Sequence, residues 1–231
     1  MVTLSISIDG PTASGKSTLA MALAQRLGLA FLDTGLSYRS LAYVLHYRPD
    51  EIPRGELERH LLHQPAVYPR QGAEQWAQEH SILFRGEDIT DEIWLPELES
   101  TLKNIAGDPG WRSEILRMHQ GVKEKYGSIV AVGRDVAVTL LPGAELHVYL
   151  TAELAVRRER RRTQYRDMKD RSTQVGPATV RDIENRDAIR RLPNSMEIDS
   201  TYSPASAVLA SVLHQIDSSA VPGVSTISSD Q

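Results

Sequence analysis

Residues 10–18 read Gly10-Pro11-Thr12-Ala13-Ser14-Gly15-Lys16-Ser17-Thr18. They fit the pattern G-x-x-x-x-G-K-S of a phosphate-binding loop. An alternating apolar run with Leu4, Ile6 and Ile8 precedes the stretch, and a helical run from Leu19 to Leu27 follows it. A strand, a loop and a helix in this order are the context in which such a loop binds nucleotide phosphates. The stretch therefore predicts a nucleoside-triphosphate site.

The residue types of this loop indicate what each position does. Gly10 and Gly15 let backbone N–H groups curl around a polyphosphate, and the start of the following helix adds a partial positive charge. Lys16 is expected to reach the β- and γ-phosphates, and Ser17 to ligate Mg²⁺. Asp9 or Asp33 could hold that Mg²⁺ through a bound water, or could simply cap the end of a strand.

The composition is that of an ordinary globular enzyme. The chain has 231 residues, 41% of them apolar and 24% charged, which allows one large α/β domain or a core with an inserted lobe. A net charge of −4 argues against a dedicated binder of nucleic acid or anionic membranes. There is no cysteine, and no uncharged run approaches the ~20 residues of a membrane span. With no signal-peptide pattern at the start of the sequence, a cytoplasmic location is expected, and monomer is the default.

Short apolar runs alternate with helical patterns along the chain, which predicts an α/β protein with a parallel sheet. Five strands are expected, at Thr3–Ile8, Ala30–Asp33, Ile129–Val132, Leu146–Leu150 and Met196–Asp199. Gly28 is placed to end the first helix, and Ala205–Ile216 carries one apolar stripe typical of a last helix.

The middle of the chain breaks this alternation and predicts an inserted lobe. A small hairpin is expected within Ser81–Thr90, and helices at Pro96–Ala106 and Trp111–Lys125. We divide the chain into a core with the phosphate loop (1–44), an acceptor-binding lobe (45–125), a second core part (126–217) and a disordered Ser-rich tail (218–231).

Residues 152–171 are strongly basic, with eight basic and four acidic side chains. Arg157, Arg158, Arg161 and Arg162 fall on one face of a predicted helix. A solvated, salt-bridged helix would explain the pattern, and an RNA-binding patch would be expected to carry interleaved aromatic residues. Beside a phosphate loop, a mobile arginine lid that neutralises a transferring phosphoryl group is the better interpretation.

Three classes of P-loop protein compete. A GTPase switch needs the base-reading pattern Asn-Lys-x-Asp, which the sequence does not contain. A large ATP-driven machine needs an acidic second motif, whereas the strand that starts at Ile129 ends in Gly133-Arg134-Asp135. A small-molecule kinase binds two anionic ligands and needs many arginines, as seen here. The third class is favoured.

The chain then resembles a known family, the bacterial cytidylate (CMP/dCMP) kinases. The resemblance starts in Ile8-Asp9-Gly10-Pro11, the phosphate loop, Leu32-Asp33-Thr34-Gly35 and Tyr38-Arg39. It continues through Gly86-Glu87-Asp88-Ile89-Thr90-Asp91-Glu92-Ile93, Pro109-x-x-Arg112, Gly133-Arg134-Asp135, the arginine-rich segment, Arg186-Asp187 and Ile198-Asp199-Ser200-Thr201. These motifs span nearly the whole chain in order. They imply a P-loop kinase fold with three layers, a five-stranded parallel sheet, an acceptor lobe and a lid.

The resemblance also implies roles for individual residues. Residues 10–18 would bind ATP, the phosphoryl donor, and Lys16, Arg134, Arg157 and Arg161 would be catalytic. The acceptor nucleotide would be bound by Asp33, Thr34, Arg39, Arg112, Arg134, Asp135 and Arg186. Arg39 and Arg134 would clamp its α-phosphate, since guanidinium forks suit phosphate, and Arg112 and Asp135 would contact the cytosine.

Two departures from the family pattern leave the acceptor's base and sugar open. Lys103 stands six residues before Pro109, where the family has a small hydroxyl residue that contacts the base. Lysine cannot accept a hydrogen bond, so it could donate to a carbonyl or an anion, or point to solvent. After Arg186-Asp187 a segment is shortened, and Arg190 or Arg191 could replace the next family arginine.

The sequence thus predicts an ATP-dependent kinase of CMP and dCMP that uses Mg²⁺. A divergent enzyme for another monophosphate or a small metabolite is the alternative, and a silent nucleotide-binding regulator is the weaker one. Among the seven histidines, His60 and His63 lie three residues apart without a third ligand nearby, so they are expected to be surface residues.

Overall fold

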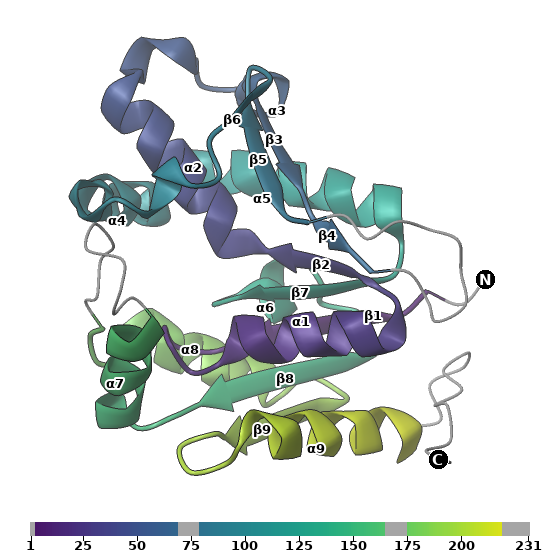
Figure 1. The fold of residues 1–231 in the computed structure, drawn as a ribbon. Coiled ribbons are helices and arrows are strands. Elements are labelled where there is room, and N and C mark those ends of the chain that lie inside the picture. Colours follow the sequence, from purple (N-terminus) through teal and green to yellow (C-terminus); the bar gives the residue numbers. More distant parts are fainter. Residues whose placement is uncertain (1–2, 69–78, 165–174, 219–231) are drawn as a thin grey trace.

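The structure is a computed structural model that describes residues 3–68, 79–164 and 175–218. Its main sheet has six strands in the order β4-β2-β7-β1-β8-β9, shown in Figure 1. The strands are β1 (Ser5–Asp9), β2 (Ala30–Asp33), β4 (Ala66–Val67), β7 (Ile129–Gly133), β8 (Leu146–Thr151) and β9 (Ser195–Asp199).

The five expected strands are confirmed and run parallel, each within two residues of its predicted ends. Strand β4 was not expected. It pairs antiparallel with the edge strand β2, through Ala30 opposite Val67 and Phe31 opposite Ala66. A run of two residues carries too little periodicity to be recognised in the sequence.

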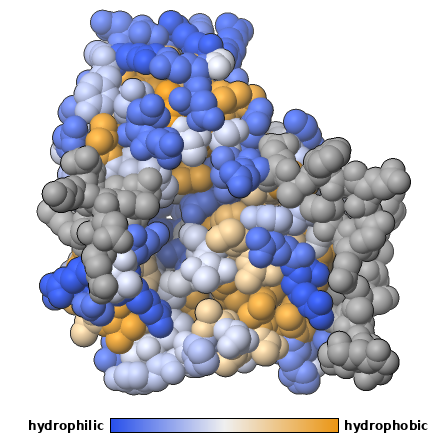
Figure 2. Space-filling model, in the orientation of Figure 1, coloured by the Kyte–Doolittle hydropathy of each residue, from blue (hydrophilic) through white to orange (hydrophobic). Residues whose placement is uncertain are grey.

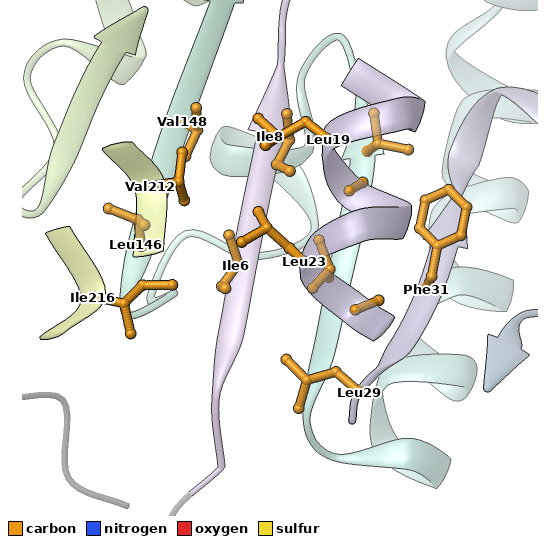
Figure 3. Close-up of a cluster of buried hydrophobic side chains, with 14 of the residues drawn as sticks. Ile6, Ile8, Leu19, Leu23, Leu29, Phe31, Leu146, Val148, Val212 and Ile216 are labelled. Atoms are coloured by element: carbon orange, nitrogen blue, oxygen red, sulfur yellow. The ribbon is translucent and has the colours of Figure 1, made fainter. Parts of the chain in front are cut away.

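Helices cover both faces of this sheet and make three layers. Helices α1 (Lys16–Leu27) and α9 (Ala205–Ser218) pack on one face, where Ile6, Ile8, Leu23 and Val212 lie in the largest core cluster (Figure 3). Helices α5 (Pro109–Tyr126), α6 (Val136–Thr139) and α8 (Val180–Ile189) pack on the other face. Helix α1 ends where the sequence predicted, because Gly28 takes the left-handed conformation at φ 64°.

A second, smaller sheet lies above the main one in Figure 1 and has the antiparallel order β3-β5-β6. The strands β5 and β6 form the expected hairpin, whose turn residues Arg85 and Gly86 both have positive φ. This part has its own core cluster, which includes Leu41, Phe84, Ile93 and Ile115. Its strands are β3 (Leu61–Gln64), β5 (Ser81–Phe84) and β6 (Glu87–Asp88).

The remaining helices connect these layers. They are α2 (Thr34–Tyr47), α3 (Leu57–His60), α4 (Glu99–Gly107), α7 (Leu154–Gln164) and the 3₁₀ turns η1 (Pro49–Glu51), η2 (Glu92–Trp94) and η3 (Pro96–Leu98). The predicted helices at 96–106 and 111–125 are therefore confirmed as η3 with α4 and as α5. Residues 165–171 of the predicted lid and residues 219–231 of the predicted tail lie outside the described residues.

The surface is hollowed between the second sheet and the main sheet (Figure 2). The carboxyl ends of parallel strands meet at one edge, where open α/β sheets bind their ligands. The phosphate loop follows β1, and Arg134 and Asp135 follow β7. Both segments lie at this edge because β1 and β7 pair in parallel, with Asp9 opposite Gly133 at their carboxyl ends. None of the helices within the three described ranges is long and apolar enough to cross a membrane.

Candidate active site

The phosphate loop follows β1 and requires glycine at its first position. Gly10 has φ 144°, and a Cβ added there would lie 2.0 Å from the carbonyl oxygen of Leu150 on β8. No residue with a side chain fits this close approach. Lys16 begins α1, and its ammonium donates to the carbonyl oxygen of Pro11 at 2.7 Å. Burial, together with the charge of Arg134, lowers the pKa of Lys16 to about 8.

Two oxygen groups meet at the mouth of the loop. The Ser17 hydroxyl donates to Asp33 Oδ2 at 2.8 Å, while Asp33 Oδ1 accepts from the backbone N–H of Gly35 and caps α2. A hydroxyl and a carboxylate are ligands that Mg²⁺ accepts. Asp33, at the end of β2, therefore caps the following helix α2 and also lies beside Ser17, which the sequence predicts to ligate Mg²⁺.

Asp9 has a different environment, at the buried end of β1. Its two carboxylate oxygens accept from the backbone N–H groups of Val136, at 2.7 Å, and Ala137, at 2.9 Å. Burial raises the pKa of Asp9 to about 7, although these two N–H groups oppose the rise. The Asp9 carboxylate therefore caps the first turn of α6, which directly follows Arg134 and Asp135. Asp9 itself belongs to β1, which is distant from α6 in the sequence.

A cavity of about 680 Å³ opens beside the phosphate loop, between α1 and the segment before α9. Arg160 of α7 lines it and donates to Ser200 Oγ at 2.9 Å. Ser200 Oγ in turn donates to the carbonyl oxygen of Ser14 at 2.9 Å. Arg160 thus links α7 to the phosphate loop, a contact that the sequence analysis missed because Arg160 lies off the helix face it selected.

The other arginines of α7 differ in their burial and in their partners. Arg157 is buried and donates to three backbone carbonyl oxygens, those of Ala152, Thr12 and Gly176, and burial lowers its pKa. Arg162 is exposed and pairs with Glu159 at 3.7 Å. Arg158 donates to the carbonyl of Val175, and Arg161 to Gln164 Oε1 at 3.4 Å. Arg157 is therefore the predicted lid arginine that touches the phosphate loop.

A second cavity, of about 240 Å³, lies between α2, α5 and the segment after β7. Its lining contains seven polar or aromatic residues, namely Thr34, Tyr38, Arg112, Ser113, His119, Asp135 and Thr139. Arg112 donates to Asp135 Oδ2 at 2.9 Å. This contact places Arg112 and Asp135 side by side, and their binding of the acceptor's base stays a prediction.

Arg39 and Arg134 are each next in sequence to a residue that lines the second cavity, but their side chains contact other partners. Arg39 pairs with Glu99 at 3.3 Å and stacks over Trp94, 5.1 Å from the ring centre. Arg134 donates to Thr12 Oγ1 of the phosphate loop at 2.7 Å and pairs with Asp182 at 3.4 Å. Arg134 therefore connects the segment that lines the second cavity with the phosphate loop of the first.

The sequence departs from the family pattern at Lys103 and in the shortened segment after Arg186-Asp187, and the structure places the residues of both regions. Lys103 is exposed on α4 and is not among the residues that line the second cavity. Arg186 pairs with Glu197 of β9 and lies over the Tyr149 ring. Arg190 pairs with the same Glu197, at 2.7 Å. In contrast Arg181, at the start of α8, pairs with Asp135 in the second cavity. Nothing in the sequence marked Arg181, because its partner is 46 residues away.

The prediction that His60 and His63 are surface residues is wrong for His63. The His63 side chain is buried with Ser37 and His119 beneath the second cavity, and Ser37 Oγ lies 2.6 Å from His63 Nδ1 and 2.8 Å from His119 Nε2. His63 lies on β3, whose alternate residues Leu61 and His63 face inward. His60 is half-buried and pairs with Glu56 at 3.4 Å.

Comparison with known proteins identifies relatives whose sequences match most of this chain. Residues 6–218 match the protein family described as "Cytidylate kinase". A protein named cytidylate kinase from Chloroflexus aggregans is 38% identical over 70% of this chain and 70% of its own length. One of the same name from Stutzerimonas stutzeri is 31% identical over 91% and 94%. A bifunctional pantoate ligase/cytidylate kinase from Synechococcus sp. is 32% identical over 86% of this chain but 41% of its own length.

Proposed function

Because the chain belongs to the cytidylate kinase family, we propose that it transfers the γ-phosphate of ATP to CMP or dCMP. The observation that carries the proposal is Arg134, which bonds to Thr12 in the phosphate loop while its neighbour Asp135 lines the second cavity. A donor in the first cavity and an acceptor in the second would meet at this arginine. Two anionic ligands need such a cation between them.

In this proposal the acceptor's phosphate oxygen attacks the γ-phosphorus of ATP. A new oxygen–phosphorus bond forms, the bond from the γ-phosphorus to the β–γ bridging oxygen breaks, and ADP leaves. The acceptor oxygen is already an anion, so no general base is needed. Lys16 and the backbone of residues 10–18 hold the donor phosphates, and Arg134, Arg157 and Arg161 neutralise the charge that spreads over the transferring group.

Mg²⁺ fits Ser17 and Asp33 better than Asp9. Both oxygens of Asp9 already accept backbone N–H groups, whereas Ser17 and Asp33 present a hydroxyl and a carboxylate at the loop's exposed mouth. Ser17 would ligate the ion directly and Asp33 through water, and when bound the ion would neutralise charge on the donor's β- and γ-phosphates.

On the acceptor side, Arg39 and Arg134 would bind the α-phosphate and Arg112 and Asp135 the base, with Asp33 and Thr34 nearby. Arg186 could join them only by leaving Glu197. We infer the same division of the chain as before, with residues 45–125 as the acceptor lobe and residues 152–171 as the lid that keeps water from the transferring group.

The test is ADP formation from ATP·Mg²⁺ with CMP, dCMP, UMP, dUMP, AMP, GMP and dTMP as acceptors. Strong preference for CMP and dCMP supports the proposal, and preference for another acceptor favours the divergent enzyme. Lys16→Ala should abolish turnover because the donor phosphates lose their cation. Lys103→Ala is the matched control and should leave CMP kinetics unchanged, since Lys103 is exposed. Near-normal activity of Lys16→Ala would contradict the donor site.

A further inference from the structure

Two neighbouring residues that follow β7 form ion pairs with two neighbouring residues at the start of α8. Arg134 pairs with Asp182 at 3.4 Å, and Asp135 pairs with Arg181. Asp182 is buried and also caps α8 by accepting from Thr179. The start of α8 is thus fastened by two crossed ion pairs to the two residues after β7 that the proposed function assigns to the acceptor.

Arg181 also forms a hydrogen bond to α4. Its Nη1 donates to the carbonyl oxygen of Ala106 at 3.3 Å, in the last turn of α4. A guanidinium suits this place, because the last carbonyl groups of a helix lack partners within the helix and carry partial negative charge. One side chain therefore joins α8, α4 and Asp135.

The two arginines on Asp135 share a single oxygen. Arg112 and Arg181 both donate to Oδ2, while Oδ1 accepts no hydrogen bond from residues 3–68, 79–164 or 175–218. An arginine that pairs alone with a carboxylate commonly takes both oxygens with its two parallel N–H groups. The second guanidinium on Oδ2 opposes that geometry, and so it keeps Oδ1 without a hydrogen bond from the three described ranges, on a residue that lines the second cavity.

We infer that Arg181 is a positioning residue that prepares Asp135 to recognise an amino group on the acceptor's base. The inference rests on the proposed function. A free carboxylate oxygen accepts a hydrogen bond and cannot donate one, so it binds a 4-amino pyrimidine and rejects a 4-oxo pyrimidine. Arg181 would thereby supply selectivity for CMP over UMP, although Lys103 stands where the family has its base-reading hydroxyl.

The test compares steady-state kinetics of Arg181→Ala with CMP and with UMP. Without Arg181, the Arg112 guanidinium can pair with both carboxylate oxygens of Asp135. The acceptor's base must then displace Arg112 from Oδ1 before it can bind there. We expect KM for CMP to rise about tenfold, kcat and the KM for ATP to change less than about threefold, and the CMP-to-UMP ratio of kcat/KM to fall about tenfold. Arg181→Lys, which restores a cation beside Oδ2, should recover most of that ratio.

The control is Arg117→Ala, which removes an exposed arginine of α5 that pairs with Glu58 of α3 at 3.5 Å. It should match the wild type in the KM for CMP and in the CMP-to-UMP ratio of kcat/KM. An unchanged CMP-to-UMP ratio in Arg181→Ala, or an equal loss of kcat for both nucleotides with KM unchanged, would overturn the inference. If Arg181→Ala does not fold, Arg181→Gln is measured by the same criteria. Absence of CMP turnover in the wild type would instead refute the proposed function.

Discussion

The buried histidines beneath the acceptor cavity should make the protein lose stability in mild acid. His119 Nε2 and His63 Nδ1 share the hydroxyl of Ser37, which can donate only one proton. Burial lowers the pKa of His119 from 6.5 to about 4, and it lowers the pKa of His63 well below its ordinary value. Neither ring can take up a proton without a large cost in this environment.

The sign and size follow from proton linkage. The folded pKa of His119 lies below the unfolded value, so the unfolded chain binds more protons and stability falls as pH decreases from 6.5 towards about 4. His119 alone should remove about 2 kcal/mol from the unfolding free energy at pH 5, and about 3 kcal/mol once the pH is below the folded pKa. His63 adds to this loss in the same direction.

The assay is urea unfolding of the wild type and of His119→Gln at several pH values between 7.5 and 5. Glutamine keeps an amide that can bond Ser37 and does not titrate, so the variant should lose about 2 kcal/mol less over this range than the wild type does. His214→Gln, at an exposed position of α9, is the control and should follow the wild type. Equal losses in the wild type and in His119→Gln would refute the reasoning.

Two further predictions follow from the site. Arg39→Ala should raise the acceptor KM about tenfold or more, because a phosphate would lose a guanidinium, with little change for ATP; steady-state kinetics in which only the ATP KM changed would contradict this. Gly10→Ala should lower the unfolding free energy by at least about 2 kcal/mol, since its Cβ would meet the Leu150 carbonyl. Gly121→Ala, in open space within α5, should instead raise it by about 0.5–1 kcal/mol in the same urea assay.

Features that depend on neighbouring residues could be predicted from the sequence. The positive φ of Gly10 and Gly15, the left-handed end of α1 at Gly28 and the hairpin turn at Arg85-Gly86 all reflect what a few adjacent residues allow. The five parallel strands were also found, because buried strands read as short apolar runs between helical segments.

The sequence could not predict which partner a long charged side chain selects. Arg181 and Asp135 are 46 residues apart, and Arg160 and Ser200 are 40 apart, so only the tertiary structure brings each pair together. His63 was expected at the surface because no third metal ligand lies near His60 and His63 in the sequence. The second sheet and the hydroxyl of Ser37 decide its place.

The sequence by itself determined the phosphate loop and the parallel sheet, because backbone conformation and hydrophobic periodicity act over short distances along the chain. The tertiary structure decided that Arg134 touches the phosphate loop, that Asp9 caps α6, and that two guanidinium groups share one oxygen of Asp135. These contacts join segments that are distant in sequence. Their geometry depends on strand order and helix packing, which no local pattern encodes.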